Sequence, residues 1–600
     1  MRRPLAGVAL DTILHVGMPY RADMTASAAR LQVERWVPGV RVLRTYERSW
    51  LPKDLIAGAV LVTLLVPQGM AYAELAGLPA INGLYTTVVC LIAYALVGPS
   101  PILVLGPDSS LGPMIAATIL PLAAGDPQQA IALAGMLAIL VGIVMVGAAA
   151  LKLGFVADLL SNPVRTGYLA GLAIVILIGQ LPKLFGFSTD ADWLVAEVGA
   201  FFDGLEMTNP WALGIGLLSL GLILGLKRLS PRTPGILVAV VIAIGLSILL
   251  DLAARGVDVI GVLPQGFPVP TFPAVDVVDI PLLVASALGI SLVAVGDTIS
   301  TSGGFAARAG YEVDGDQELA GIGSANLAAG LFTGFPVSTS GSRTAVAFQS
   351  GAKTQLTGLV AAVLVIGMLL FVPGLVRAMP QPVLAAVVIA ASISLFDVAA
   401  LRRLYRVQRT EFWLAVACAL GVMFVGVLQG IVIAVLLSAA YIFTRAAAPY
   451  STVLGKAPDV PGWHDVRHYP GSEQVPGLLI VRWSAPLFFA NANQFRDRIR
   501  GLVKAADRPP RWILVAAEPI SEIDTTAAAM LADLGLELDS QGIRLAFAEL
   551  PTSVRDAMVR FGLLETIDED HLYASVTEGV EAFREEDRSG RPGTKAAKDP

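Results

Sequence analysis

Four hydroxyl side chains and one arginine lie together inside a strongly apolar stretch of the chain, at residues 338–343. Hydroxyl groups can donate hydrogen bonds, and an arginine carries a fixed positive charge. A charge inside an apolar, membrane-like segment is costly, so it is expected to have a function. Donors clustered around a cation provide the chemistry that holds an anion. The residues expected in this anion site are Ser340, Gly341, Ser342 and Arg343, next to Ser338 and Thr339.

Two carboxylates, Asp108 and Asp297, are expected in the same layer as these donors. A permanently ionised carboxylate would repel an anion, but burial disfavours the charged form. Proton binding and anion binding would then favour each other, which gives symport. A sodium ion held by Asp297, Thr301 and nearby carbonyls would couple the two in the same way. Two structural roles also remain open, in which Asp108 caps a helix and Asp297 is the partner of Arg343.

Two similar stretches must position these side chains. Residues 103–114 read LVLGPDSSLGPM, and residues 331–344 read LFTGFPVSTSGSRT. Each has an apolar run, a glycine, a proline and then serines, and proline and serine favour the first turn of a helix. We therefore predict two half-helices that start near the middle of a membrane, where non-helical backbone must be enclosed by protein. Their N-termini would offer N–H donors and partial positive charge, with Ser109 and Ser110 contributing from the first.

Equal spacings indicate an internal repeat. The positions of Pro107 and Pro336 differ by 229, and those of Gln68 and Asp297 differ by the same number. Repeats with an odd number of spans have opposite topology in a membrane. A pair of seven-span inverted repeats would bring the two half-helix N-termini together from opposite sides, where transporters of this kind place their substrate.

Composition supports a membrane protein with a soluble appendage. Charged residues make up 15% of the 600 residues, whereas about 25% is usual in soluble domains. Charges are sparse from about residue 55 to 441 and ordinary after about 445. We expect an N-terminal cytoplasmic or interfacial segment (1–50), a transport domain (51–445), a linker (446–475), an α/β domain (476–586) and a disordered tail (587–600).

Apolar segments predict fourteen spans, for which about 20 residues each is typical. They lie at about 55–73, 83–98, 107–121, 129–151, 165–181, 211–227, 235–250, 283–302, 320–333, 338–350, 356–372, 383–396, 411–426 and 428–444. Basic residues mark the cytoplasmic ends of spans. They include Arg41, Arg44, Arg48, Lys53, Lys152, Arg165, Lys227, Arg228, Arg232, Arg402, Arg403, Arg406 and Arg409. This pattern places both termini in the cytoplasm.

Several of these stretches resemble the sulfate permease (SulP) family of anion transporters. The resemblance is carried by LVPQGMAYAELAGLPAINGLYTTVV (65–89), LGPDSS and GFPVSTSGSRTAV. It implies a core of spans 1–4 and 8–11, a gate of spans 5–7 and 12–14, a homodimer and an elevator-like movement of the core. The family's anion-site positions match Gln68, Tyr72, Asp108, Ser340, Ser342 and Arg343. The coupling carboxylate matches Asp297, and Thr301 and Thr339 match cation-site positions of sodium-coupled relatives.

The C-terminal part alternates strands and helices, as a small α/β layer does. We expect strands at GLLIVRW, PLFFAN, RWILVAAEPI and RLAFAEL, with helices between and after them. The run ISEIDTTAAAM resembles the STAS domain shared by sulfate transporters and anti-sigma-factor antagonists. The resemblance implies a possible regulatory site at Asp524 and Thr525, where Thr525 matches the residue that antagonists phosphorylate. Asp524 alone could also serve only as a helix cap.

Other functions find little support in the sequence. Cys90 and Cys418 lie in apolar runs, as small buried hydrophobes do, and no metal-ligand spacing or nucleophile–base pair is present. We therefore expect no enzyme, no cofactor, no metal and no nucleic-acid partner. The expected function is proton-coupled sulfate uptake across a bacterial-type cell membrane. The alternatives are a sodium-dependent bicarbonate transporter, an uncoupled exchanger or channel, and an anion-sensing regulator.

Overall fold

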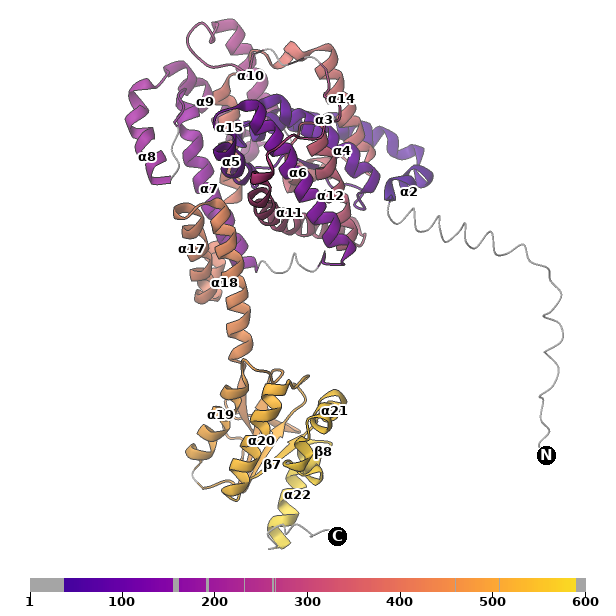
Figure 1. Ribbon diagram of the computed structural model, residues 1–600, viewed down its shortest axis with the longest axis vertical. Helices are drawn as coiled ribbons and strands as arrows, with labels where there is room; N and C mark the ends of the chain where they lie inside the picture. The colour runs from indigo at the N-terminus through magenta and orange to yellow at the C-terminus, as the bar shows by residue number, and fades with distance from the viewer. Residues whose placement is uncertain are drawn as a thin grey trace, which may run out of the picture. The chain divides into compact units, whose positions relative to one another are not determined.

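The computed structural model describes residues 37–154, 161–189, 194–230, 233–261, 264, 266–458, 460–506 and 508–589. Most of the expected N-terminal segment, and the tail beyond Ser589, lie outside these residues. The chain divides into two compact units, Met1–Ser438 and Ala439–Pro600. The first is helical, and the second combines helices with a sheet (Figure 1).

Each of the fourteen predicted spans overlaps a helix. These helices are α3 (Leu51–Leu75), α4 (Ala80–Val97), α5 (Gly112–Ala123), α6 (Pro127–Ala150), α7 (Asn162–Phe185), α9 (Pro210–Leu229), α10 (Gly235–Leu250), α11 (Ile280–Ala309), α12 (Gly315–Leu331), α13 (Gly341–Gln349), α14 (Leu356–Phe371), α15 (Gln381–Leu395), α17 (Arg409–Phe424) and α18 (Val427–Ala447). Within the described ranges, seven helical stretches are long and apolar enough to cross a membrane; they contain α3, α4, α6, α7, α9, α11 and α15. The shorter helices α2 (Pro38–Thr45), α8 (Leu194–Asp203) and α16 (Val398–Val407) were not among the predicted spans.

The helices of the first unit pack as two groups. In one, which we call the core group, α6 packs on α11 and α12, α3 packs on α4, α13 and α14, and α5 packs on α6. In the other, the gate group, α7 packs on α15 and α17, α9 packs on α10 and α15, and α18 packs on α17. The two groups meet where α3 contacts α10 and α15. This division agrees with the core and gate that the family resemblance implies.

Glycines allow helices to pack closely in both groups. A Cβ atom on Gly330 of α12 would lie 2.4 Å from the carbonyl oxygen of Gly135 on α6, and one on Gly142 would lie 2.7 Å from that of Gly323. In the gate group, a Cβ atom on Gly167 of α7 would lie 2.1 Å from the carbonyl oxygen of Ala415. Small residues at such crossings let backbones approach closely, which is how helices associate in a membrane.

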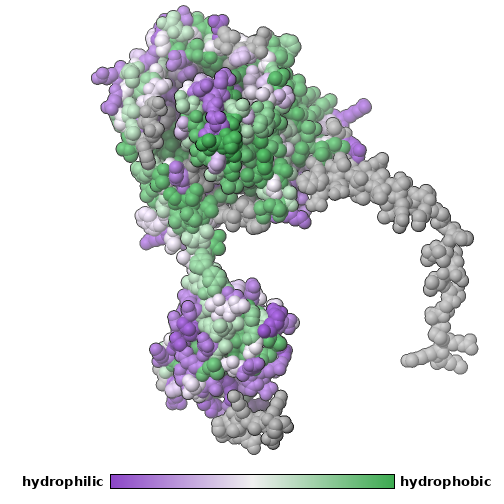
Figure 2. Space-filling view, in the orientation of Figure 1, coloured by the Kyte–Doolittle hydropathy of each residue, from purple (hydrophilic) through white to green (hydrophobic). Residues whose placement is uncertain are grey.

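The surface of the first unit fits a lipid environment. Figure 2 shows apolar residues over much of the visible face of this unit and more hydrophilic residues on the second unit. Exposed apolar side chains include Leu217 on α9, Val363 on α14 and Leu436 on α18. Because lipid tails are as apolar as these side chains, their exposure is expected for spans and would be unusual over so large an area in a soluble protein.

Two short strands place the half-helices. β1 (Leu105–Gly106) precedes α5 and β2 (Ser338–Thr339) precedes α13. They pair antiparallel, with Leu105 opposite Thr339 and Gly106 opposite Ser338. Pairing satisfies backbone groups that would otherwise be costly to bury. The two half-helices are as short as predicted, and the strand pair fixes the segments that lead into them side by side.

The second unit contains a sheet whose strand order, within the described residues, is β4-β3-β5-β6-β7-β8. The strands are β3 (Ser451–Lys456), β4 (Trp463–Asp465), β5 (Leu478–Trp483), β6 (Trp512–Ala516), β7 (Arg544–Ala548) and β8 (Leu572–Tyr573), and the helices are α19 (Ala492–Ala505), α20 (Thr525–Ser540), α21 (Thr552–Arg560) and α22 (Val576–Ser589). Strands β5 to β8 are parallel neighbours, and β3 and β4 are antiparallel.

Two expectations for this unit differ from the structure. The expected linker, 446–475, contains β3 and β4, and β3 pairs with β5 through Ser451, Thr452 and Val453. The expected strand at PLFFAN is irregular, because only Leu487 makes an isolated bridge, to Ile523. In that segment Asn491 ties the backbone into a turn, since its side chain accepts from Phe488 N and donates to the carbonyl of Pro486. Asn491 is the N-cap residue of α19.

Replacement of Asp524 by alanine is expected to destabilise the second unit. Asp524 is the N-cap of α20, and its carboxylate accepts from Ala527 N at 2.8 Å and from Phe489 N at 2.8 Å. Loss of an N-cap typically costs about 1 kcal/mol of unfolding free energy. Urea unfolding of fragment 439–589 measures it, with Asp533→Ala, an exposed residue of the same helix, as control. Equal effects of the two substitutions would contradict the capping role.

Candidate anion site

Arg343 is fully buried in the first turn of α13 and reaches across to the segment before α5. Its Nη2 donates to the carbonyl oxygen of Pro107 at 2.7 Å and lies 3.9 Å from Asp108 Oδ2. Its Nε and Nη1 atoms have no hydrogen-bond partner within the described part of the chain. Gly106 makes room for the guanidinium, because a Cβ atom there would lie 2.6 Å from Nη1. A buried guanidinium with two unpartnered donors calls for a negatively charged ligand.

The start of α13 adds donors beside this charge. The expected span begins at residue 338, but α13 begins at Gly341. Ser340 is its N-cap, and Ser340 Oγ accepts from Arg343 N at 3.5 Å. Ser342 Oγ lies 3.1 Å from Ser340 Oγ, and Gly341 and Ser342 are exposed. The first N–H groups of a helix have no partner within the helix. Hydroxyl and backbone donors at this end therefore converge near Arg343.

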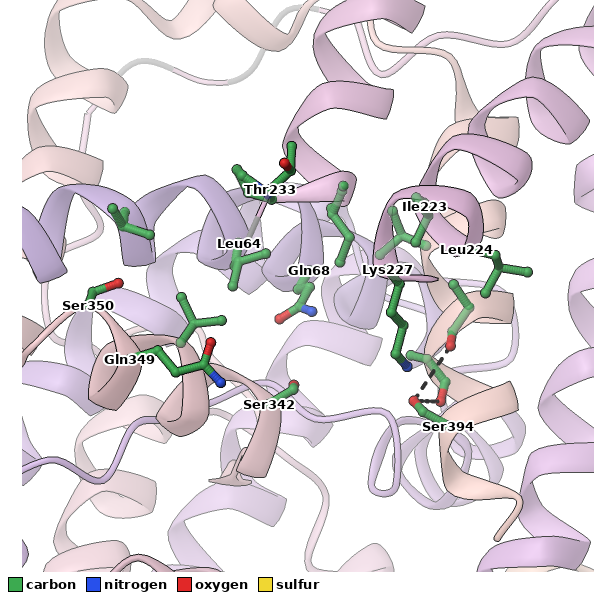
Figure 3. A pocket seen from close by; sticks show the side chains of 18 of the residues that line it. Leu64, Gln68, Ile223, Leu224, Lys227, Thr233, Ser342, Gln349, Ser350 and Ser394 are labelled. Atoms are coloured by element: carbon green, nitrogen blue, oxygen red, sulfur yellow. Dashed lines mark hydrogen bonds between the residues drawn. The ribbon is translucent and has the colours of Figure 1, made fainter. Parts of the chain in front are cut away.

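A cavity of about 730 Å³ lies between the two helix groups and reaches this end of α13. Gln68 and Tyr72 of α3 and Ser342 of α13 line it on the core side. Figure 3 shows Gln68 and Ser342 facing the space, while Lys227 extends from α9 toward Ser394. Gln68 Oε1 has no hydrogen-bond partner among the residues described. Of the expected anion-site residues, Gln68, Tyr72 and Ser342 thus share one solvent space.

Asp108 differs from its expected place, because it does not start α5. The helix begins at Gly112, with Leu111 as an N-cap that makes no side-chain bond. Asp108 Oδ1 instead accepts from Ser110 N at 2.9 Å and Ser110 Oγ at 2.8 Å. This local turn competes with the helix for the backbone N–H groups, as aspartate often does. Asp108 therefore caps a turn within the loop before the helix.

Asp297 forms an ion pair with Arg165. The alternative prediction, in which Asp297 is the structural partner of Arg343, is therefore wrong. Asp297 Oδ1 lies 2.8 Å from Arg165 Nη2 on α7, and Oδ2 lies 3.2 Å from Ser110 Oγ. The sequence indicated Arg165 only as a basic residue at a cytoplasmic end. A basic residue in the first turn of a predicted span could have indicated a buried ion pair. Its partner could not be identified from the sequence, because Asp297 lies 132 positions away.

The two threonines expected near a cation site lie close to α13. Thr339 is buried in β2, and its Oγ1 has no partner among the described residues, as is true of Ser338 Oγ. Thr301 of α11 is half-buried, and its Oγ1 lies 4.0 Å from where a Cβ atom on Gly341 would be. Ser109 is buried beside Ser110.

In the described ranges there is no cluster of three or more His, Cys, Asp or Glu side chains that could hold a metal.

The expected regulatory pair lies in the second unit. Asp524 caps α20, which fits the capping interpretation, and Thr525 is the exposed first residue of the helix. A hydroxyl in that position is accessible to solvent. The regulatory role remains a prediction.

Sequence reasoning missed two side chains of the site. Lys227 lines the large cavity, although its place near a basic loop indicated only membrane orientation. Tyr168 of α7 is buried next to Arg165, and its hydroxyl has no hydrogen-bond partner in the described residues. Both residues belong to the gate group. Which of its side chains reach the site depends on how the two helix groups pack, and no local sequence motif indicates this.

Comparisons with known proteins show the family of the chain. Residues 51–418 match the model of the sulfate permease family, and residues 469–579 match the STAS domain. The chain is 40% identical over 549 residues to the probable sulfate transporter Rv1739c of Mycobacterium tuberculosis strain ATCC 25618 / H37Rv, covering 92% of this chain and 98% of the relative. It is 30% identical over 580 residues to the chloroplastic sulfate transporter 4.1 of Arabidopsis thaliana, covering 93% and 84%.

Solved structures support the fold. The inward-facing murine Slc26a9 anion transporter has a TM-score of 0.84 at 21% identity, covering 98% of this chain and 100% of that one. The transmembrane domain of the cyanobacterial bicarbonate transporter BicA has a TM-score of 0.58 at 22% identity, covering 65% and 98%. With the family match over most of the helical unit and a relative at 40% identity, the chain belongs to the sulfate permease family, whose members are multi-pass membrane transporters and not enzymes.

Proposed function

We propose that this protein imports inorganic sulfate together with protons. The observation that carries the anion part is the buried Arg343, which has two unpartnered guanidinium nitrogens and lies between the start of α13 and the segment before α5. The large cavity is lined by Ser342, the residue before Arg343, and would give a soluble anion access to this end of α13. Sulfate is the substrate proposed because relatives at 40% and 30% identity are named as sulfate transporters. The cavity is also lined by Lys227, which suits a doubly charged anion.

The proton part rests on two carboxyl groups that share one hydroxyl. Ser110 Oγ lies 2.8 Å from Asp108 Oδ1 and 3.2 Å from Asp297 Oδ2, yet a hydroxyl has one proton to donate. If either carboxyl is protonated, it can donate to Ser110 Oγ, and Ser110 can donate to the other carboxylate. One bound proton thus completes the hydrogen bonds and removes one negative charge near the anion. This makes proton and sulfate binding mutually favourable.

We also infer the transport geometry. The core group carries both half-helices and Asp297, while Arg165 and Lys227 belong to the gate group, so an elevator movement of the core would carry the anion past a fixed gate. Fourteen spans as two inverted repeats fit the antiparallel pairing of β1 and β2 and the repeated spacing of 229. Lys227 near the cavity, with the other basic ends, favours a cytoplasmic opening and cytoplasmic termini. We propose a homodimer in the cell membrane.

Proteoliposomes with labelled sulfate outside test this function. An inward proton gradient is expected to raise the initial uptake several-fold above that without a gradient, because the proton gradient supplies the driving force. Replacement of external sodium by choline is expected to leave uptake unchanged. Uptake that depends on sodium and not on the proton gradient would contradict proton coupling and favour the sodium-dependent alternative. Binding without flux would favour the anion-sensing alternative.

A further inference from the structure

A small second cavity lies within the first unit, between α7, α11 and α18. Its volume is about 20 Å³, enough for one water molecule or one small cation. Arg165, Tyr168, Asp297 and Ala434 are among the residues that line it. The buried Tyr168 hydroxyl has no partner in the described residues, so this small space has a polar group that a bound water or ion could contact. The cavity is separate from the larger one that Gln68 and Ser342 line.

The ion pair at this cavity joins the two helix groups. Arg165 is in the first turn of α7 in the gate group, and Asp297 is in α11 of the core group. Their side chains are 28% and 16% exposed, so neither charge is fully hydrated. In the elevator movement proposed above, the two groups would slide past one another, and the 2.8 Å bond between Arg165 and Asp297 would exist in only one of their arrangements. The pair therefore favours the arrangement seen in this structure.

The pair is also connected to the anion site. Three charged or titratable side chains face Asp297 directly or through one hydroxyl: Arg165 and Tyr168 from α7, and Asp108 through Ser110. Arg343 follows next, 3.9 Å from Asp108. Asp297 therefore lies between a cation of the gate group and the anion-binding cation of the core group. When the core moves away, Arg165 remains on the gate and Asp297 loses its nearest positive charge.

We propose that Arg165 is the gate-borne counter-ion of Asp297, which the coupling proton or a small cation replaces at Asp297 when the core moves. This proposal rests on the proposed coupled transport. It makes Arg165 a positioning residue: it holds the core while Asp297 is charged and without another cation. A core with an ionised, unpaired Asp297 is thereby kept from moving, which prevents the anion from leaking without its coupling ion.

Spin labels on lipid-exposed helices measure the two arrangements directly. Val363→Cys on α14 and Leu217→Cys on α9 place one label on each helix group, outside both cavities. Cys90 and Cys418 are buried, so the full-length protein offers a low labelling background. Pulsed dipolar spectroscopy in lipid nanodiscs then gives the ratio of the two core positions. Arg165→Gln is expected to lower the share of this arrangement, relative to the other, by about fivefold or more.

Two further variants decide the cause. Arg165→Lys keeps the cation and is expected to leave the ratio within about twofold of the wild type. Arg402→Gln removes an exposed charge from α16, which lies outside the pair, and is expected to change nothing. The proposal would be overturned if Arg165→Gln left the ratio unchanged. It would also be overturned if either Arg165→Lys or Arg402→Gln shifted the ratio as much as Arg165→Gln does.

Flux separates this proposal from the proposed function. In proteoliposomes, Arg165→Gln is expected to carry sulfate with fewer protons per anion than the wild type, because the restraint on the uncoupled core is lost. If the wild type shows no proton-stimulated uptake, the proposed function fails, but the label ratio still tests the Arg165–Asp297 restraint. If the wild type is coupled and Arg165→Gln keeps the same proton-to-sulfate ratio, the role of Arg165 is wrong and the proposed function stands.

Discussion

Replacement of Arg343 by alanine is expected to weaken sulfate binding by about 30-fold or more. The guanidinium is the buried charge next to the half-helix starts, and loss of one partner of a buried, hydrogen-bonded charge pair typically costs about 2–5 kcal/mol. That range corresponds to factors of about 30 to several thousand in affinity. The sulfate affinity of Arg343→Lys should lie between those of the wild type and Arg343→Ala. Lysine keeps a positive charge but lacks the planar guanidinium that can contact two sulfate oxygens at once.

Calorimetry with purified protein measures this effect. Because Arg343 also donates to the carbonyl of Pro107, the variant needs a test of folding, for which thermal unfolding of the detergent-solubilised protein is suitable. Arg402→Ala makes the same change at an exposed arginine of α16 and should bind sulfate as the wild type does. An Arg343→Ala protein that is folded and binds sulfate with unchanged affinity would show that Arg343 has only a structural role.

Replacement of Asp297 by asparagine is expected to abolish the stimulation of sulfate uptake by an inward proton gradient. Asparagine is close in shape to aspartate but cannot take up a proton at physiological pH. The proton shared along the Asp108–Ser110–Asp297 chain therefore loses one of its two binding sites. Sulfate binding should remain within a few-fold of the wild type, since in the described part of the chain Asp297 is linked to Arg343 through Ser110 and Asp108 and makes no direct contact with it.

Uptake at several proton gradients separates the two effects. The control is Asp276→Asn, which removes an exposed carboxylate before α11 and should leave the gradient response intact. If Asp297→Asn still responds fully to the gradient, the proton binds elsewhere. Asp108→Asn would then be the variant to compare, because Asp108 is the other carboxyl group that Ser110 joins.

The half-helices could be predicted because their signals are local. Proline, glycine and serine within a few residues indicate that a helix starts nearby, and one of the serines, Ser340, caps α13. The helix begins at Gly341, slightly later than the predicted start at residue 338. The same reasoning placed the start of α5 too early. Asp108 can satisfy Ser110 N within its own turn, and this local bond delays the helix to Gly112.

The gate side of the site could not be predicted in the same way. The Arg165–Asp297 pair joins residues 132 positions apart, and the large cavity combines α3 and α13 with α9, α10 and α15. Such contacts depend on how helices cross, for which close approach at glycines such as Gly167 is one determinant. In the second unit, β3 is only six residues long and is followed by a stretch rich in glycine and proline, which is typical of a linker. Its pairing with β5 is a long-range contact that no local sequence pattern indicates.

Sulfate-driven proton movement tests the central claim most directly. Proteoliposomes contain a pH-sensitive dye, are clamped at zero membrane potential with potassium and valinomycin, and receive external sulfate with no initial pH difference. Coupled import predicts that sulfate entry acidifies the lumen, and that Asp297→Asn admits sulfate with no such acidification. Wild-type sulfate entry with no change in lumenal pH would contradict proton-coupled transport.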